Sequence, residues 1–163
     1  MKQKAWLLLI LLVVVILGSG FLFLNTKILV LQLENKDHMR TLSLQIKPLE
    51  RFSIYYIHSI HQEPVIEEFE AAPDNTIVLK GVRTKSPAIA EEYGLDDRKS
   101  THPMDERLGA IFFRVAPGEG QGLIVRDRKI YLNEIGRSGD RIQLSVRSIS
   151  KASYLLARLS KTS

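Results

Sequence analysis

The chain has 163 residues, which suits one domain of ordinary size after an N-terminal segment of 27 residues. It contains no cysteine, so disulfides, thiolate metal sites, a catalytic cysteine and a lipid-modified cysteine anchor are excluded. The net charge of +5 is unevenly distributed: residues 50–108 hold 7 basic and 12 acidic groups, whereas residues 126–163 hold 9 and 3. Because basic residues are not interleaved with aromatic ones, this distribution argues against nucleic acid as a partner.

The first predicted element is a transmembrane helix over residues 5–24. This stretch carries no charge, and 15 of its 20 residues are Leu, Ile, Val or Phe. Twenty helical residues match the roughly 30 Å hydrocarbon core of a bilayer. The short N-terminal tail favours a single-pass protein of the cell membrane that contacts lipid through residues 5–24, with its domain on the extracytoplasmic side. The alternative is a signal peptide cleaved near Gly18-Ser19-Gly20, although Phe21–Leu24 continue the apolar run.

Residues 28–147 show the period-two alternation of β-strands. Thr41–Ile46, for example, places Leu42, Leu44 and Ile46 on one face. The pattern predicts an all-β extracytoplasmic domain, a small antiparallel sandwich or barrel-like fold of about nine short strands. The expected strands cover residues 28–33, 41–46, 52–58, 64–70, 76–82, 110–115, 123–126, 129–132 and 141–146.

Two segments within this domain interrupt the alternation. Residues 83–108 contain two prolines and six carboxylates with few large apolar residues, which predicts a long functional loop or a flap. Residues 117–122 contain a G-x-G-x-G run, but the following residues favour a strand rather than a helix. A phosphate-binding loop needs a helix there, so we predict a turn.

The chain ends with a predicted basic amphipathic helix within residues 148–163. Ala152, Leu155, Leu156 and Leu159 fall on one helical face, and Lys151, Arg158 and Lys161 lie elsewhere. Such a helix packs on the sheet or lies on a membrane surface, and the first arrangement is favoured. The predicted organisation is therefore an anchor over residues 1–27, a β-rich domain over 28–147 and this helix.

The residues best suited to chemistry lie in one predicted hairpin turn. His58 and His61 are three residues apart, and Glu67 follows closely. Residues three apart in a regular strand point to opposite faces. A turn over residues 59–63, which Pro64 permits, would bring the two imidazoles together. With Glu67, or with His102 from the long loop, they could ligate zinc or a related divalent ion.

A binding surface without catalysis is the simpler interpretation of the same hairpin. Its residues would contact a small ligand or a partner protein, and they are Tyr56, His58, Ser59, Pro64 and Glu67. A Ser59 nucleophile with a histidine base is disfavoured, because the strand–turn–helix setting that exposes such a serine is missing.

The hairpin also carries a family resemblance. The pattern Tyr-x-His-Ser followed by Pro-Val-x-Glu falls on Tyr56, His58, Ser59, Pro64, Val65 and Glu67. It resembles the signature of an uncharacterised family of small β-rich bacterial and archaeal proteins whose genes commonly lie beside TAXI-type TRAP transporters. Members usually carry a Gly-Ala-Gly-like turn where this chain has Ser86–Gly94, so no function of that turn is expected here.

The resemblance implies a membrane-anchored extracytoplasmic accessory protein. It would contact the binding protein or the permease of a TRAP transporter, or hold a small ligand. An enzymatic role is less favoured. The alternative function is a metal-dependent hydrolase that uses His58, His61 and Glu67.

Overall fold

The computed structural model describes residues 2–96, 98–118 and 120–159, without the side chains of residues 2–5 and 7–9. The chain forms two compact units, one of Leu29–Arg147 and one that combines Met1–Ile28 with Ser148–Ser163. In chain order the elements are α1 (Lys2–Asn25), β1 (Lys27–Asn35), β2 (Thr41–Ile46), β3 (Arg51–Ile57), β4 (Pro64–Ala71), β5 (Ile77–Thr84), α2 (Pro87–Glu92), β6 (Thr101–Leu108), β7 (Ile111–Arg114), β8 (Gln121–Val125), β9 (Arg128–Tyr131), the 3-10 turn η1 (Leu132–Glu134), β10 (Arg141–Ser150) and α3 (Lys151–Leu159).

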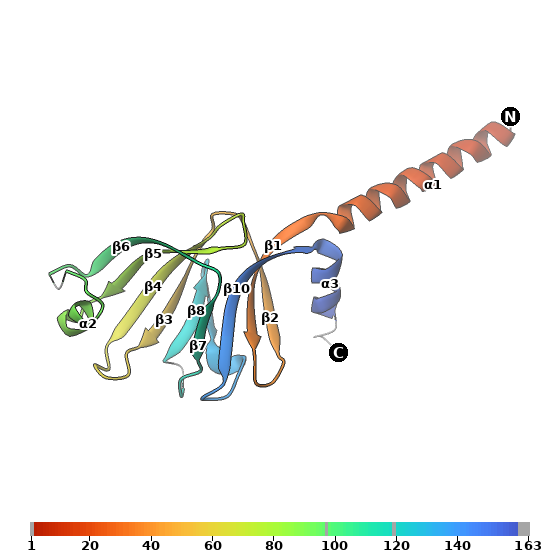
Figure 1. Ribbon diagram of the computed structural model, residues 1–163. Coiled ribbons are helices and arrows are strands. Elements are labelled where there is room, and N and C mark those ends of the chain that lie inside the picture. The colour runs from red at the N-terminus through yellow and green to blue at the C-terminus, as the bar shows by residue number, and fades with distance from the viewer. Residues whose placement is uncertain (1, 97, 119, 160–163) are drawn as a thin grey trace. The chain divides into compact units, whose positions relative to one another are not determined.

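The larger unit consists of two antiparallel sheets (Figure 1). One has four strands in the order β2-β1-β10-β7, and the other has six in the order β6-β5-β4-β3-β8-β9. A single apolar core joins residues of both sheets. Its members include Leu31 and Leu33 of β1, Phe52 and Ile54 of β3, and Ile142 and Leu144 of β10. This arrangement is consistent with a β-sandwich and confirms the prediction of a β-rich domain.

The alternation in the sequence follows the inner face of the six-stranded sheet. Ile54 lies opposite Leu123 of β8 on one side and Glu67 of β4 on the other. Glu67 in turn lies opposite Val82 of β5, and Val82 opposite His102 of β6. Residues opposite one another in a sheet share a face, so Glu67 and His102 lie on the same inward row as Ile54 and Val82.

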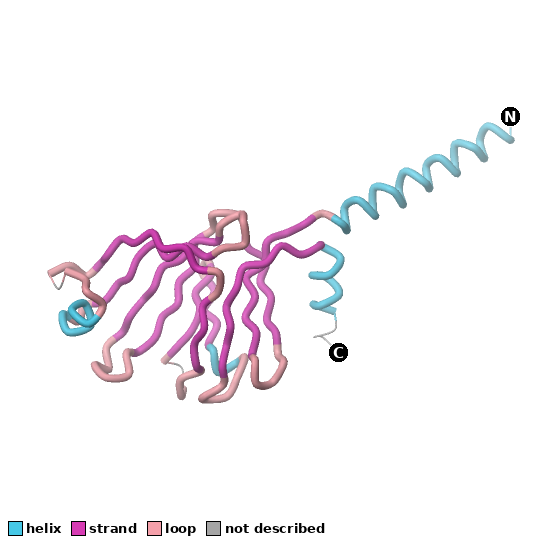
Figure 2. Tube along the Cα trace, viewed as in Figure 1, coloured by secondary structure: helices cyan, strands magenta, loops and turns pink. Residues whose placement is uncertain are grey.

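The prediction of a long loop over residues 83–108 was wrong in part. The segment contains a short helix, α2, and a strand, β6 (Figure 2). The described residues therefore hold ten strands rather than about nine. β6 pairs only with β5 at the edge of its sheet, and most of its side chains are exposed. An edge strand is held by backbone hydrogen bonds and needs no alternation, and it also tolerates Pro103.

The glycine-rich run is divided between a turn and a strand. Gly118 has a φ of +69°, as the predicted turn requires, whereas Gly122 lies within β8 and Glu119 lies outside the described residues. A Cβ atom on Gly122 would be 2.5 Å from Cε1 of Tyr55 and 2.7 Å from the carbonyl oxygen of Ile130. Gly122 is therefore needed because the Tyr55 ring lies directly over it.

The smaller unit contains α1 and α3. Residues 5 and 7–9 of the predicted anchor have side chains outside the described part. Across what the structure describes, no helix combines the length and the apolar character needed to cross a membrane. β10 continues to Ser150, so α3 begins three residues later than predicted, and residues 160–163 of the predicted helix lie outside the described residues.

Candidate metal site

A tight turn between β3 and β4 brings His58 and His61 together. The amide of His58 donates to the carbonyl of Glu63 at 2.9 Å, and the amide of Gln62 donates to the carbonyl of His58 at 2.9 Å. Gln62 adopts a left-handed conformation with φ of +55°, which reverses the chain. The two imidazole rings consequently stack with their centroids 5.1 Å apart. The chain thus turns between the two histidines, as the sequence led us to expect.

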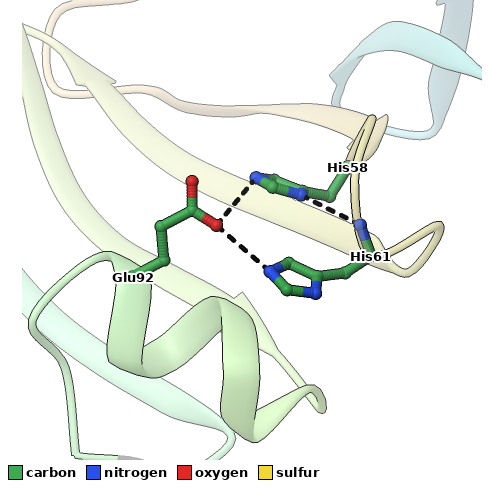
Figure 3. Close-up of side chains that lie close together, drawn as sticks. All are labelled: His58, His61 and Glu92. Carbon is green, nitrogen blue, oxygen red and sulfur yellow. Dashed lines mark hydrogen bonds and ion pairs between the residues drawn. The ribbon is translucent and has the colours of Figure 1, made fainter.

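The third member of the cluster is Glu92 at the end of α2. Its Oε2 lies 3.6 Å from Nε2 of His58 and 3.2 Å from Nε2 of His61 (Figure 3). One ligand atom from each of the three residues can be chosen so that all lie within 4.8 Å of one another. His58 is nearly buried, whereas 46% of the Glu92 side chain is exposed, so an ion can reach the cluster from solvent.

Local sequence explains why α2 begins and ends where it does. Ser86 caps the helix by accepting a hydrogen bond from the amide of Ile89, and Pro87 occupies the first turn. Gly94, with φ of +65°, follows Tyr93, the residue that caps the C-terminus of the helix. Ile89 is fully buried and packs against Val65 and Val82 in a small apolar cluster. This packing fixes the position of Glu92.

The two imidazole–carboxylate spacings suit a small divalent cation. Zinc binds imidazole nitrogen and carboxylate oxygen at roughly 2.0–2.2 Å, so ligand atoms on a tetrahedral ion lie about 3.3 Å apart. The two imidazole–carboxylate distances of 3.6 and 3.2 Å are close to that value. Three protein ligands leave a fourth position for water or another ligand.

Metal binding would require one local adjustment at His58. Its Nδ1 accepts a hydrogen bond from the amide of His61 at 3.4 Å. Coordination through Nε2 places the imidazole proton on Nδ1, where it would face that amide. The contact is long, so a small rotation of the ring opens it at little cost.

Glu67 belongs to a neighbouring hydrogen-bonded group. The hydroxyl of Tyr56 donates to Oε1 of Glu67 at 2.9 Å and lies 2.8 Å from the hydroxyl of Tyr93. Burial raises the pKa of the Glu67 carboxyl, and the hydrogen bond from Tyr56 opposes part of that rise. Burial also raises the pKa of Tyr56, and the contacts with Tyr93 and Glu67 raise it further. The site therefore consists of two groups: the cluster of His58, His61 and Glu92, and the hydrogen-bonded group of Tyr56, Glu67 and Tyr93. They adjoin because Glu92 and Tyr93 are consecutive residues.

The other residues singled out from the sequence lie around these groups. Ser59 is exposed in the turn, where its carbonyl accepts a hydrogen bond from the Gln62 side chain, and Pro64 begins β4. His102 is 5% exposed, and its Nε2 has no hydrogen-bond partner among the described residues. It lies on the inner face of β6, apart from the cluster of His58, His61 and Glu92.

Sequence reasoning missed Glu92 and Tyr93. Both follow a recognisable helix start, Ser86-Pro87, and precede a recognisable helix stop, Gly94. These signals could have located α2. They could not have shown that its last turn lies over the β3–β4 turn, which depends on packing between residues distant in sequence.

Comparison with known proteins gives one family. Residues 52–132 match the model of a family described as a domain of unknown function (DUF1850). That match supports the expected resemblance to a family whose function is uncharacterised. It includes the β3–β4 turn, α2 and all three residues of the candidate metal site. No curated protein and no solved structure matched. The predicted association with TRAP transporters stays a prediction.

Proposed function

We propose that this domain binds one divalent cation of the zinc class through His58, His61 and Glu92. The observation that carries the proposal is the convergence of two imidazoles on one carboxylate oxygen, at 3.6 and 3.2 Å. Nitrogen and oxygen donors of this kind suit zinc and related transition metals better than calcium or magnesium, which prefer oxygen ligands. An ion pair between these histidines and Glu92 has similar nitrogen–oxygen distances but binds no metal. Direct measurement of bound metal therefore distinguishes the two arrangements.

The decisive test is metal titration of the purified full-length chain in detergent. Calorimetry with zinc should give one ion per chain, and Glu92→Gln should weaken binding by at least about tenfold because it removes an anionic ligand. Glu91→Gln is the matched control, since Glu91 is the exposed neighbour of Glu92 on the same helix and lies outside the cluster. Absence of zinc binding, or equal weakening in the two variants, would overturn the proposal.

We further propose that the domain is a membrane-tethered extracytoplasmic accessory of a TRAP-type solute transporter. The uncharged residues 5–24 and the resemblance at the β3–β4 turn support this role. Apolar side chains beside the metal site also support a docking surface there: Ile60 is 73% exposed, Ile57 44% and Tyr93 42%. Isolated exposed apolar residues are common, but Ile57 and Ile60 adjoin the two histidines in sequence and the Tyr93 ring lies 6.4 Å from that of His58, so all three lie near the site where a protein partner could contact them.

Site-specific crosslinking in native membranes tests this second proposal. A photoreactive residue in place of Ile60 should crosslink to a transporter binding protein or permease, identified by mass spectrometry. The matched control is Met39, which is 92% exposed in the turn between β1 and β2, away from the site in sequence and topology. Crosslinks of equal yield at both positions, or none to a transporter subunit, would contradict the proposal.

A metal-dependent hydrolase remains the alternative function. Its catalytic set would contain His58 and His61, with Glu92 rather than Glu67 as the nearby carboxylate. Water at the open position of the ion would be the nucleophile, as in zinc hydrolases with three protein ligands.

A further inference from the structure

The helix α3 presents an apolar face that no part of the described chain covers. None of the side chains in Lys151–Leu159 is buried. Leu155 is 45% exposed, and Leu156 and Leu159 are each 67% exposed. These three leucines lie on one side of the helix, at spacings of one, three and four residues. A soluble helix usually buries such a face, so α3 lacks its partner.

The start of α3 is fixed to the end of α1. The amide of Lys151 donates to the carbonyl of Thr26 at 3.0 Å. The ammonium of Lys151 also lies 3.8 Å from the centroid of the Phe23 ring, at a cation–π distance. Both contacts lie within the smaller unit of the chain. α3 therefore begins where the uncharged run of residues 5–24 ends.

The charge of this part of the chain indicates what the apolar face meets. Residues 148–163 hold three basic residues, Lys151, Arg158 and Lys161, and no acidic one. Basic residues beside an apolar helical face are typical of helices that lie in the headgroup layer of anionic membranes. A second copy of α3 is a poorer partner, because it would bring like charges together.

We propose that α3 lies in the headgroup layer of an anionic bilayer, with Leu155, Leu156 and Leu159 directed toward the acyl chains. The inference rests on the proposed membrane tether. If residues 5–24 occupy the hydrocarbon core, Thr26 lies at its boundary, and the bond from Lys151 to Thr26 places the start of α3 at the same depth. α1 and α3 would then both contact the membrane.

The cysteine-free sequence permits a direct test. Full-length chains carrying Leu156→Cys or Leu159→Cys are labelled with an environment-sensitive fluorophore and reconstituted into vesicles. Ala157→Cys, on the opposite side of the helix, is the matched control. In vesicles of phosphatidylcholine with phosphatidylglycerol, labels at 156 and 159 should be blue-shifted and quenched several-fold less by aqueous iodide than the label at 157. Added salt, or Lys151→Gln with Arg158→Gln, should reduce the protection.

Two outcomes would overturn the inference. Equal quenching at positions 156 and 157 in anionic vesicles would show that the face does not meet lipid. Self-quenching that depends on the density of labelled chains would show that a second copy covers it instead. A label on Leu17→Cys reports the tether separately: protection at 17 without protection at 156 would reject only the placement of α3. Zinc binding is measured independently, so its failure is also distinguishable.

Discussion

A single carboxylate oxygen, Oε2 of Glu92, accounts for the chemistry of the candidate site. It contacts both imidazoles, at 3.6 and 3.2 Å, and its residue adjoins Tyr93 in the neighbouring hydrogen-bonded group. Removal of this carboxylate would leave two histidines without an anionic partner. Glu92 is therefore the residue whose substitution best separates a metal site from a turn that happens to contain two histidines.

At the same scale, Glu67 predicts a dependence of stability on pH. Its pKa is raised above the ordinary value of 4.5, mainly by burial, so the folded state holds the proton more tightly than the unfolded state. The contribution to stability is therefore complete below pH 4.5 and is lost as the pH rises through the higher folded-state pKa. Glu67→Gln keeps an acceptor for Tyr56 without an ionisable group. We expect it to be more stable than the wild type at neutral pH, with the difference shrinking toward pH 4.5.

Urea unfolding of both chains across this pH range, with chelator present, measures the effect. Glu63→Gln is the control, because Glu63 is exposed in the β3–β4 turn. If the free energy of unfolding varied with pH in the same way for the wild type and Glu67→Gln, the burial of Glu67 would have no energetic consequence.

At the scale of elements, the short helix α2 determines whether the site is complete. A helix of six residues has little stability of its own, so its position depends on the burial of Ile89 against Val65 and Val82. The histidines are held independently of α2 by the turn between β3 and β4. The site therefore joins one part held by the turn between β3 and β4 and one part whose position depends largely on the burial of Ile89.

Ile89→Ala should consequently weaken zinc binding without touching a ligand. Loss of a fully buried isoleucine side chain costs about 2–5 kcal/mol, which is enough to release α2 from the sheet. We expect zinc affinity to fall by about tenfold or more, measured by calorimetry. Ile60→Ala is the matched control, since Ile60 belongs to the same site but is 73% exposed. Unchanged affinity in Ile89→Ala would mean that Glu92 does not need α2 docked.

At the scale of the whole molecule, metal binding links segments that are distant in sequence. The β3–β4 turn supplies two ligands and α2 supplies the third, about thirty residues later, as the separation of His61 and Glu92 shows. Because the site requires the folded chain, binding free energy adds to the stability of the sandwich.

Zinc should therefore raise the melting temperature of the full-length chain. At a free concentration one hundred times the dissociation constant, the gain is about 2.7 kcal/mol, which corresponds to several degrees. Differential scanning fluorimetry should show the rise, its reversal by chelator and its absence in Glu92→Gln. An equal rise in Glu92→Gln would mean that zinc binds elsewhere.

Features that depend on local pattern could be predicted from the amino-acid sequence alone. Alternation of apolar residues, as in Leu42, Leu44 and Ile46, is enough to predict strands because one face of each sheet must be buried. Pro64 after a polar stretch was enough to place the turn that unites His58 and His61. Both features follow from interactions between residues near each other in the chain.

The pairing of β6, the place of β10 in its sheet and the position of Glu92 depend on tertiary contacts. Strand β6 has no alternation because an edge strand is held by its backbone, and the position of β10 between β1 and β7 follows from packing across the core. Glu92 stands beside the histidines because Ile89 of α2 packs against Val65 of β4 and Val82 of β5. Contacts of this kind join residues far apart in the chain. Local sequence patterns do not specify which distant residues will pack together.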